Sequence, residues 1–176
     1  MNALTRTPQN TNLLQPTKFL LVFDRLPTVQ FFCQSVNIPG VSVGQAPVNF
    51  PSLMVYSPGN QLAYNNFNVD FLVDESMTTW QEIYNWFRSF AGPDGTAERN
   101  QLSNVSSQGK STQKPWYSDA TLTILSALNN PVVRVQFINM FPVSISDLNF
   151  DTKQSADDIL VGTANFVYEQ FKFLPV

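Results

Sequence analysis

The chain has 176 residues, of which 43% are hydrophobic and only 13% are charged, and its formal net charge is −3. These values fit one domain with a buried core, exclude a chain that is disordered throughout, and argue against sequence-independent binding of nucleic acid. Histidine is absent and Cys33 is the single cysteine, which excludes Ser-His-Asp and Cys-His catalysis, an internal disulfide and a CxxC metal site.

Residues 1–16 are rich in Thr, Asn, Gln and Pro and predict an N-terminal arm. Two runs typical of β-strands follow, KFLLVFDR at residues 18–25 and VQFFCQSV at residues 29–36. Because only three residues separate these runs, we expect them to form a hairpin. The Asn-Ile-Pro-Gly sequence at residues 37–40 should end it, since Pro-Gly favours a turn.

Residues 41–66 combine many apolar side chains with prolines at 47, 51 and 58, which exclude a central strand. The Pro-Gly-Asn sequence at 58–60 predicts the tip of a protruding hairpin with SLMVY and QLAYN as its arms. This segment has two interpretations. It either folds back over its own core or reaches a neighbouring molecule.

The run NFNVDFLV at residues 66–73 alternates apolar and polar side chains, the pattern of a half-buried strand. Asp-Glu-Ser at 74–76 then predicts the start of a helix, with acid in its first turn. An apolar stripe at helical spacing follows, formed by Met77, Trp80, Tyr84 and Phe87. Three further residues widen this stripe: Ile83, Trp86 and Phe90. The helix, which should end near residues 91–93, either packs a broad face on the sheet or exposes part of it for docking.

Residues 92–118 lack apolar periodicity and are rich in Gly, Ser, Gln and Asn, which predicts a mobile loop. Strand character returns at residues 119–128 and 132–140, and the Asn-Asn-Pro turn between these runs predicts a hairpin. Residues 141–158 have the composition of a polar connector. Residues 162–174 alternate imperfectly and predict one last strand.

The order of these elements predicts a mainly β, α+β domain over residues 17–176. Its architecture would be an antiparallel β-sandwich or a partly open barrel with one packed α-helix.

No group of residues has the spacing of a catalytic or cofactor-binding site, so we expect a protein that is not an enzyme and has no cofactor or metal. The adjacent acids at 74–75 and 157–158 are interpreted as a helix cap and a solvated loop. Asp147 and Asp151 do not have the spacing of a calcium-binding loop. Cys33 is expected to fill the core.

Several short features follow one another in an order and spacing that resemble a known family. The first features are Phe31-Phe32-Cys33 with Asn-Ile-Pro-Gly at 37–40, and then the excursion through Pro47 and Pro51. The strand at 67–73 follows, with Asp74-Glu75 before a helix that contains Trp80, Trp86 and Phe87. The last feature is Phe141-Pro142, which precedes residues 143–147 and a final aromatic strand. Through these features most of the chain resembles the tail tube proteins of contractile-tailed bacteriophages.

The resemblance implies a structural subunit of the virion tail, assembled in the host cytoplasm without a membrane anchor. Six copies would form a ring, and stacked rings would form a hollow tube that contacts sheath and baseplate proteins. Genomic DNA would pass through the lumen without specific binding. Wherever the negative net charge of each copy faces the bore, it would repel DNA phosphates.

In this family the excursion after the early strands reaches the adjacent ring, so residues 41–66 would form an inter-ring clamp. Its apolar contacts would be Val48, Phe50, Leu53, Met54 and Tyr56. The helix would lie outward, towards the sheath. Its sheath-contacting or core face would comprise Trp80, Tyr84, Trp86 and Phe87.

Three alternatives stay open. Within the same fold, the chain is a baseplate tube initiator, or a tube subunit of a phage-derived contractile injection system. In a different class, it is a ligand-binding β-barrel whose aromatic side chains line a pocket.

Overall fold

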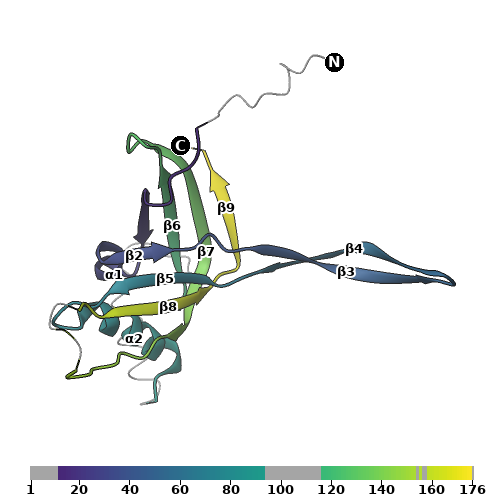
Figure 1. Ribbon diagram of the computed structural model, residues 1–176. Helices are drawn as coiled ribbons and strands as arrows, with labels where there is room; N and C mark the ends of the chain where they lie inside the picture. Colours follow the sequence, from purple (N-terminus) through teal and green to yellow (C-terminus); the bar gives the residue numbers. More distant parts are fainter. Residues whose placement is uncertain (1–11, 94–115, 154, 156–157, 176) are drawn as a thin grey trace.

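The computed structural model in Figure 1 describes residues 12–93, 116–153, 155 and 158–175. These residues form nine strands and two helices. The strands are β1 (Phe19–Phe23), β2 (Cys33–Val36), β3 (Val41–Phe50), β4 (Leu53–Tyr64), β5 (Phe67–Leu72), β6 (Ser118–Leu125), β7 (Pro131–Ile145), β8 (Val161–Val167) and β9 (Gln170–Leu174). The helices are α1 (Pro27–Phe31) and α2 (Thr78–Ala91). The predicted mainly β, α+β class is confirmed, with one more helix than expected.

The main sheet is antiparallel throughout, with strand order β1-β6-β7-β8-β5-β2, and β9 also pairs with β7. Strand β7 is shared between two halves that cross steeply in Figure 1. We call β1, β6, residues 131–140 of β7, and β9 sheet A. We call β2, β5, β8 and residues 141–145 of β7 sheet B. Within the described residues the strands do not close into a barrel, because β1 and β2 end the order.

The core lies between sheets A and B, where aromatic rings from the two sheets meet. The ring of Phe67 on β5 lies 4.5 Å from that of Phe137 on β7. The ring of Phe23 on β1 lies 5.4 Å from that of Phe166 on β8, and Trp86 of α2 packs on Phe166 at 5.9 Å. Burial alternates along β5 as predicted, because a strand directs successive side chains to opposite faces.

The predicted hairpin of residues 18–25 with residues 29–36 is wrong. Strand β1 pairs with β6, β2 pairs with β5, and α1 lies between them. Pro27 opens this helix, where its fixed φ and missing N–H cost nothing. The backbone N–H and the hydroxyl of Thr28 both donate to the carboxylate of Glu82 on α2. These bonds to α2 hold residues 27–31 as a helix.

Helix α2 begins at Thr78 and ends at Ala91, close to the predicted bounds. Asp74 accepts hydrogen bonds from the backbone N–H of Thr79 at 2.8 Å and from its hydroxyl at 2.9 Å, while Met77 has a left-handed backbone with a φ of 56°. Hydrogen bonds from Ser76 and Thr79 hold the pKa of the Asp74 carboxyl well below its usual range. The fully buried face of the helix comprises Thr79, Ile83, Trp86 and Ser89. The predicted stripe is therefore displaced around the helix towards residues 83 and 86.

Two predictions about the C-terminal third are wrong. Residues 141–145 continue β7 instead of starting the connector, and residues 162–174 form two strands, β8 and β9. The left-handed backbone of Asn139, with a φ of 53°, and the register shift near residue 119 mark the place where β7 passes from sheet A to sheet B. Strand β8 pairs with residues 141–145 of β7, and β9 pairs with residues 134–138. A single straight strand over residues 162–174 could not make both of these pairings.

The hairpin of β6 and β7 is confirmed, and Asn129 in its turn has a φ of 63°. Of the predicted N-terminal arm, residues 1–11 lie outside the described residues, and residues 12–16 have no regular secondary structure. Most of the predicted loop at 92–118 also lies outside the described residues.

Candidate functional site

A two-stranded ribbon of β3 and β4 projects far from the body, as an extension of β2 and β5 (Figure 1). Every side chain of β3 is exposed, and on β4 only Gly59 and Tyr64 are half-buried. The predicted tip at residues 58–60 is wrong, because the turn lies at residues 51–52 and Phe50 pairs with Leu53. The predicted arms, SLMVY at 52–56 and QLAYN at 61–65, both lie on β4, except for Ser52 in the turn and Asn65 after the strand.

Glycine explains why the Pro-Gly sequence is not the tip. A Cβ atom on Gly59 would lie 2.6 Å from the carbonyl oxygen of Gly44, so the two strands approach closely at this place. The register of the ribbon shifts between Val43 and Gln45, beside the same contact. The prolines within β3 and β4 are tolerated because each strand has an unpaired edge.

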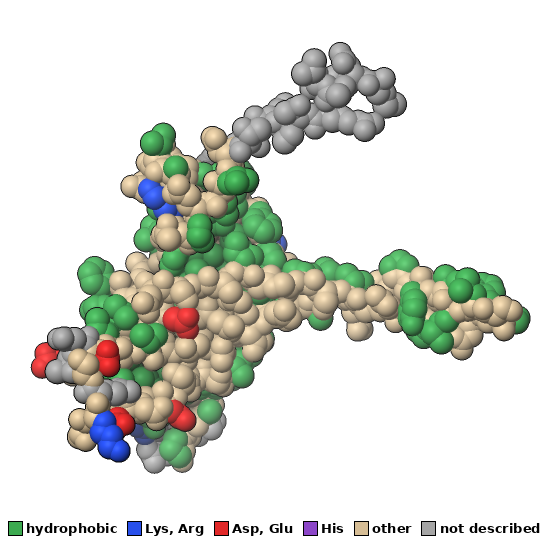
Figure 2. All heavy atoms as spheres, viewed as in Figure 1, with side chains coloured by type: hydrophobic (Ala, Val, Ile, Leu, Met, Phe, Trp, Pro, Cys, Tyr) green, Lys and Arg blue, Asp and Glu red, His purple; other side chains and the backbone are tan. Residues whose placement is uncertain are grey.

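The outer half of the ribbon has two faces, and both carry apolar side chains. The register places Val48, Phe50, Leu53 and Val55 on one face. The opposite face carries Pro47, Asn49, Met54 and Tyr56. The five residues predicted as contacts are 43–65% exposed, and Figure 2 shows apolar side chains gathered at the ribbon end. Residues 26–69 include no charged residue, so an apolar partner would desolvate no charge on the ribbon.

Val55 was not among the predicted contacts, although it pairs with Val48 on the first face. Val55 could have been predicted from the sequence, because side chains two residues apart in a strand, such as those of residues 53 and 55, lie on the same face. The five predicted residues do not form one surface, because the register assigns three of them to one face and two to the other.

The base of the ribbon is anchored by aromatic rings. Tyr64 lies 5.7 Å from Tyr168 and 5.5 Å from Phe171, measured between ring centroids. The phenol of Tyr168 donates a 3.0 Å hydrogen bond to the carbonyl oxygen of Asn65. Burial, with Tyr64 close by, raises the pKa of Tyr168 to about 12. The ribbon is therefore fixed at its base, and its side chains are exposed along nearly all of its length among the residues that the structure describes.

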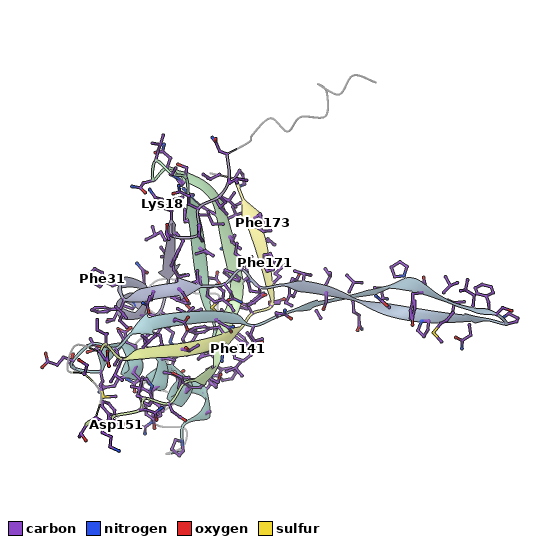
Figure 3. The ribbon with its side chains drawn as sticks, viewed as in Figure 1. Lys18, Phe31, Phe141, Asp151, Phe171 and Phe173 are labelled. Atoms are coloured by element: carbon purple, nitrogen blue, oxygen red, sulfur yellow. The ribbon has the colours of Figure 1, made fainter. Side chains whose placement is uncertain are left out.

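Among the described residues, sheet A has two edges without a paired strand, one along β1 and one along β9. Its four strands alternate in direction, so β1 and β9 run in opposite directions. Each edge strand has five residues, and exposed apolar side chains lie on both: Leu20 on β1, and Phe173 on β9 (Figure 3). Unpaired strand edges of this kind are templates for pairing with another chain.

The four helix residues predicted as a sheath-contacting or core face differ in how deeply they are buried: Trp80, Tyr84, Trp86 and Phe87. Trp86 is only 1% exposed, its ring N–H donates to the carbonyl oxygen of Trp116 at 2.9 Å, and Arg25 lies over the ring at 5.2 Å. It is a core residue, and burial also lowers the pKa of Arg25 to about 10. Tyr84 is 42% exposed.

Trp80 stacks on Tyr84 with the ring centroids 5.3 Å apart, and Phe87 is half-buried. The accessible part of the helix surface therefore centres on Tyr84, with the stacked Trp80 beside it.

No catalytic chemistry is visible in the described residues. Burial, and then the charge of Asp70, raise the pKa of the Cys33 thiol to about 11, so the thiol is protonated at neutral pH and packs against the core. Within the described ranges, no three His, Cys, Asp or Glu side chains are placed to hold a metal ion. None of the described helices is long and apolar enough to cross a membrane. The aromatic core between the open sheets gives no support to the ligand-binding barrel.

The model of a protein family described as phage tail tube protein matches residues 9–174. The chain is also 29% identical over 173 residues to the tail tube terminator protein of Enterobacteria phage T4, covering 92% of this chain and 89% of that protein. Among solved structures, the anti-feeding prophage tube terminating cap has a TM-score of 0.66 at 12% identity, over 100% of both chains.

A chain of the sheath/tube terminator of the PVC extracellular contractile injection system has a TM-score of 0.63 at 14% identity, over 94% of this chain and 99% of that one. At these identities the two structures support the fold, which is shared over almost the whole chain. The family match covers nearly all residues, and the family it names is structural rather than enzymatic. The chain thus belongs to the phage tail tube protein family, whose members are components of the virion tail.

Proposed function

We propose that the chain forms hexameric rings in a contractile phage tail, and that DNA passes through the ring. The observation that carries this proposal is the pair of unpaired edges on sheet A. Because β1 and β9 run in opposite directions, β9 of one copy can pair antiparallel with β1 of the next. Repetition of this contact around an axis removes every exposed edge of sheet A, as barrel closure does.

We also propose that the ribbon contacts the neighbouring ring. An isolated subunit exposes apolar side chains along the whole outer half of β3 and β4, and an exposed apolar surface of this kind marks an interaction site. The anchored base positions the ribbon, while its uncharged outer half supplies the contact. By the same reasoning, Tyr84 and Trp80 on α2 are the proposed contact with the sheath.

For the position in the tail, the relative in phage T4 favours the terminal ring of the tube. In that position the ribbon contacts the last ring of a different tube protein. A position in the tube body would instead require the ribbon to contact another copy of this chain. A baseplate initiator, or a tube subunit of a phage-derived injection system, would use the same two surfaces at a different place.

The test is the mass of the purified protein by light scattering, with negative-stain images of the same sample. We expect sixfold rings. Rings without tubes support the terminal position, since this chain then has no receptor for its own ribbon, whereas long hollow tubes support the tube body. A monomer at every concentration, also in the presence of the tube protein of the same phage, would contradict the ring.

A further inference from the structure

We propose that the solvent face of sheet A binds the phosphate backbone of double-stranded DNA through Arg134 and Lys172. The inference rests on the proposed ring and assigns to the lumen the face of sheet A opposite the core, because sheet B covers the other face. It replaces the expectation, drawn from net charge alone, that the bore repels DNA throughout.

The register defines this face. Along each strand of sheet A the side chains alternate between the core and solvent, and the core side contains Leu21, Leu122 and Phe137. One row of the opposite face runs across the four strands as Leu20, Thr123, Arg134 and Leu174. The next row runs as Val22, Thr121, Gln136 and Lys172. The two cations therefore lie on adjacent rows of neighbouring strands.

Arg134 and Lys172 are both exposed. They are diagonal neighbours on an antiparallel pair, a relationship in which residues are typically about 7–8 Å apart and their Cβ atoms somewhat closer. Their neighbours in the two rows include neutral polar side chains that can also donate to phosphate, namely Thr121, Thr123 and Gln136. Guanidinium and ammonium groups are the usual partners of phosphate oxygens.

A third cation, Lys18, adds positive charge at the same end of sheet A. The ammonium of Lys18 donates to the carbonyl oxygen of Ala127 at 2.7 Å and to the side chain of Asn129 at 2.9 Å, so its charge is held beside the turn between β6 and β7 (Figure 3). Lysine and arginine atoms are visible at this upper end in Figure 2, and others lie at the lower end, where the acidic atoms of that view are found.

The acids of this face lie on the row directly after the one that holds Lys172, at the end of the strands away from Lys18. Asp24 follows β1 and its backbone N–H bonds to the carbonyl oxygen of Asp119, which lies near the start of β6. The carboxylate of Asp119 accepts from the backbone N–H of Asn139. The cations of sheet A therefore occupy the rows towards Lys18 and the acids the last row, next to that of Lys172, although the chain as a whole is negative. In a closed ring, this arrangement gives the lumen a cationic band and an acidic band, and the cationic band attracts phosphates.

The experiment titrates the purified rings into a short fluorescent DNA duplex and follows its anisotropy over a series of salt concentrations. For the wild type we expect binding that weakens steeply with salt, because phosphate contacts release counterions. The double variant Arg134→Gln, Lys172→Gln should bind about tenfold more weakly at low salt, with a shallower salt dependence. Asp24→Asn should bind more tightly than the wild type.

The matched control is Lys153→Gln, which removes an exposed cation from the connector between β7 and β8, away from sheet A. It should bind like the wild type. Equal weakening by the control and the double variant, or no binding by the wild type at low salt, would overturn the proposal. Light scattering on the same samples reports the ring separately. Binding by a monomer through the same two side chains would keep the phosphate contact and contradict only the ring.

Discussion

The hydroxyl of Tyr168, in the short link between β8 and β9, donates a 3.0 Å hydrogen bond to the carbonyl oxygen of Asn65, at the foot of the ribbon. The bond joins residues 103 positions apart in the chain. It ties the place where the ribbon leaves the body to the place where the chain passes from sheet B to sheet A. The position of the ribbon relative to the edge strand β9 therefore depends on this contact and on the surrounding rings.

Replacement of Tyr168 by Phe should keep the ring packing and remove only this hydrogen bond. We expect the free energy of unfolding in urea to fall by about 0.5–1.5 kcal/mol. The raised pKa adds a pH signature. The unfolded chain loses the phenol proton above about pH 10, before the folded chain does, so wild-type stability declines there and this part of the decline should vanish in the variant.

The control for this prediction is Tyr84→Phe, which removes a hydroxyl from the exposed surface of α2. It should change stability by less than about 0.5 kcal/mol. Equal effects of the two variants would show that the bond to Asn65 contributes nothing specific.

Replacement of Leu53 by Ser should leave the ring intact and weaken the contact made by the ribbon. Leu53 is 65% exposed beside the turn, and burial of a leucine in an interface contributes about 1.5–3 kcal/mol per subunit. We expect rings of unchanged mass whose attachment to the neighbouring ring, measured by co-sedimentation with tube protein, is lost or strongly reduced.

The control is Leu62→Ser, on the same strand and 59% exposed, but in the half of the ribbon near the body. It should attach nearly as well as the wild type. Loss of attachment in both variants, or in neither, would contradict a contact localised at the ribbon end.

The sequence pattern correctly predicted elements that keep the same buried face and the same exposed face along their whole length. Strand β5 is half-buried from Phe67 to Phe71, and the alternation of its residues was sufficient to find it. Strand β7 does not meet this condition, because it leaves sheet A after residue 140 and continues in sheet B. Its second half looks like a connector in sequence, since its pairing partner, β8, lies about twenty residues further along the chain.

The ribbon and α1 show what sequence cannot supply. The Pro-Gly sequence at 58–59 favours a turn locally, but Gly59 is required for the close approach to Gly44 on the opposite strand. Residues 29–31 begin a run with strand composition, yet residues 27–31 form a helix, where Thr28 bonds to Glu82, 54 residues away. Both errors arise where a long-range contact overrides a local preference.

Replacement of Gly162 by Ala should destabilise the body of the protein. A Cβ atom there would lie 2.7 Å from the ring of Phe71, which is fully buried and has no room to move without disturbing the core. We expect a loss of about 1–3 kcal/mol in the free energy of unfolding. Gly44→Ala is the matched control, since a Cβ atom at that position meets nothing within 4 Å. A loss of the same size in the control would mean that strand flexibility, and not the Phe71 contact, decides the effect.

Replacement of Asp74 by Asn should weaken the start of α2 in a pH-dependent way. The carboxylate accepts from Ser76 and Thr79, and these bonds hold its pKa well below the usual range. Because the folded-state pKa is lowered, the ionised group stabilises the fold at every pH above its unfolded value of about 4, and this contribution is lost as the pH falls below that value. At neutral pH we expect the variant to have a melting temperature about 2–4 °C below that of the wild type.

The difference between the two melting temperatures should shrink on acidification, as the wild type loses the contribution that the variant never had. Thermal unfolding followed by circular dichroism from neutral to acid pH measures it. The exposed neighbour serves as the control, because Glu75→Gln removes the same charge from the adjacent position. That variant should melt close to the wild type at neutral pH. A gap for Asp74→Asn that stays constant down to acid pH would show that its amide disrupts the helix start for a reason other than the lost carboxylate bonds.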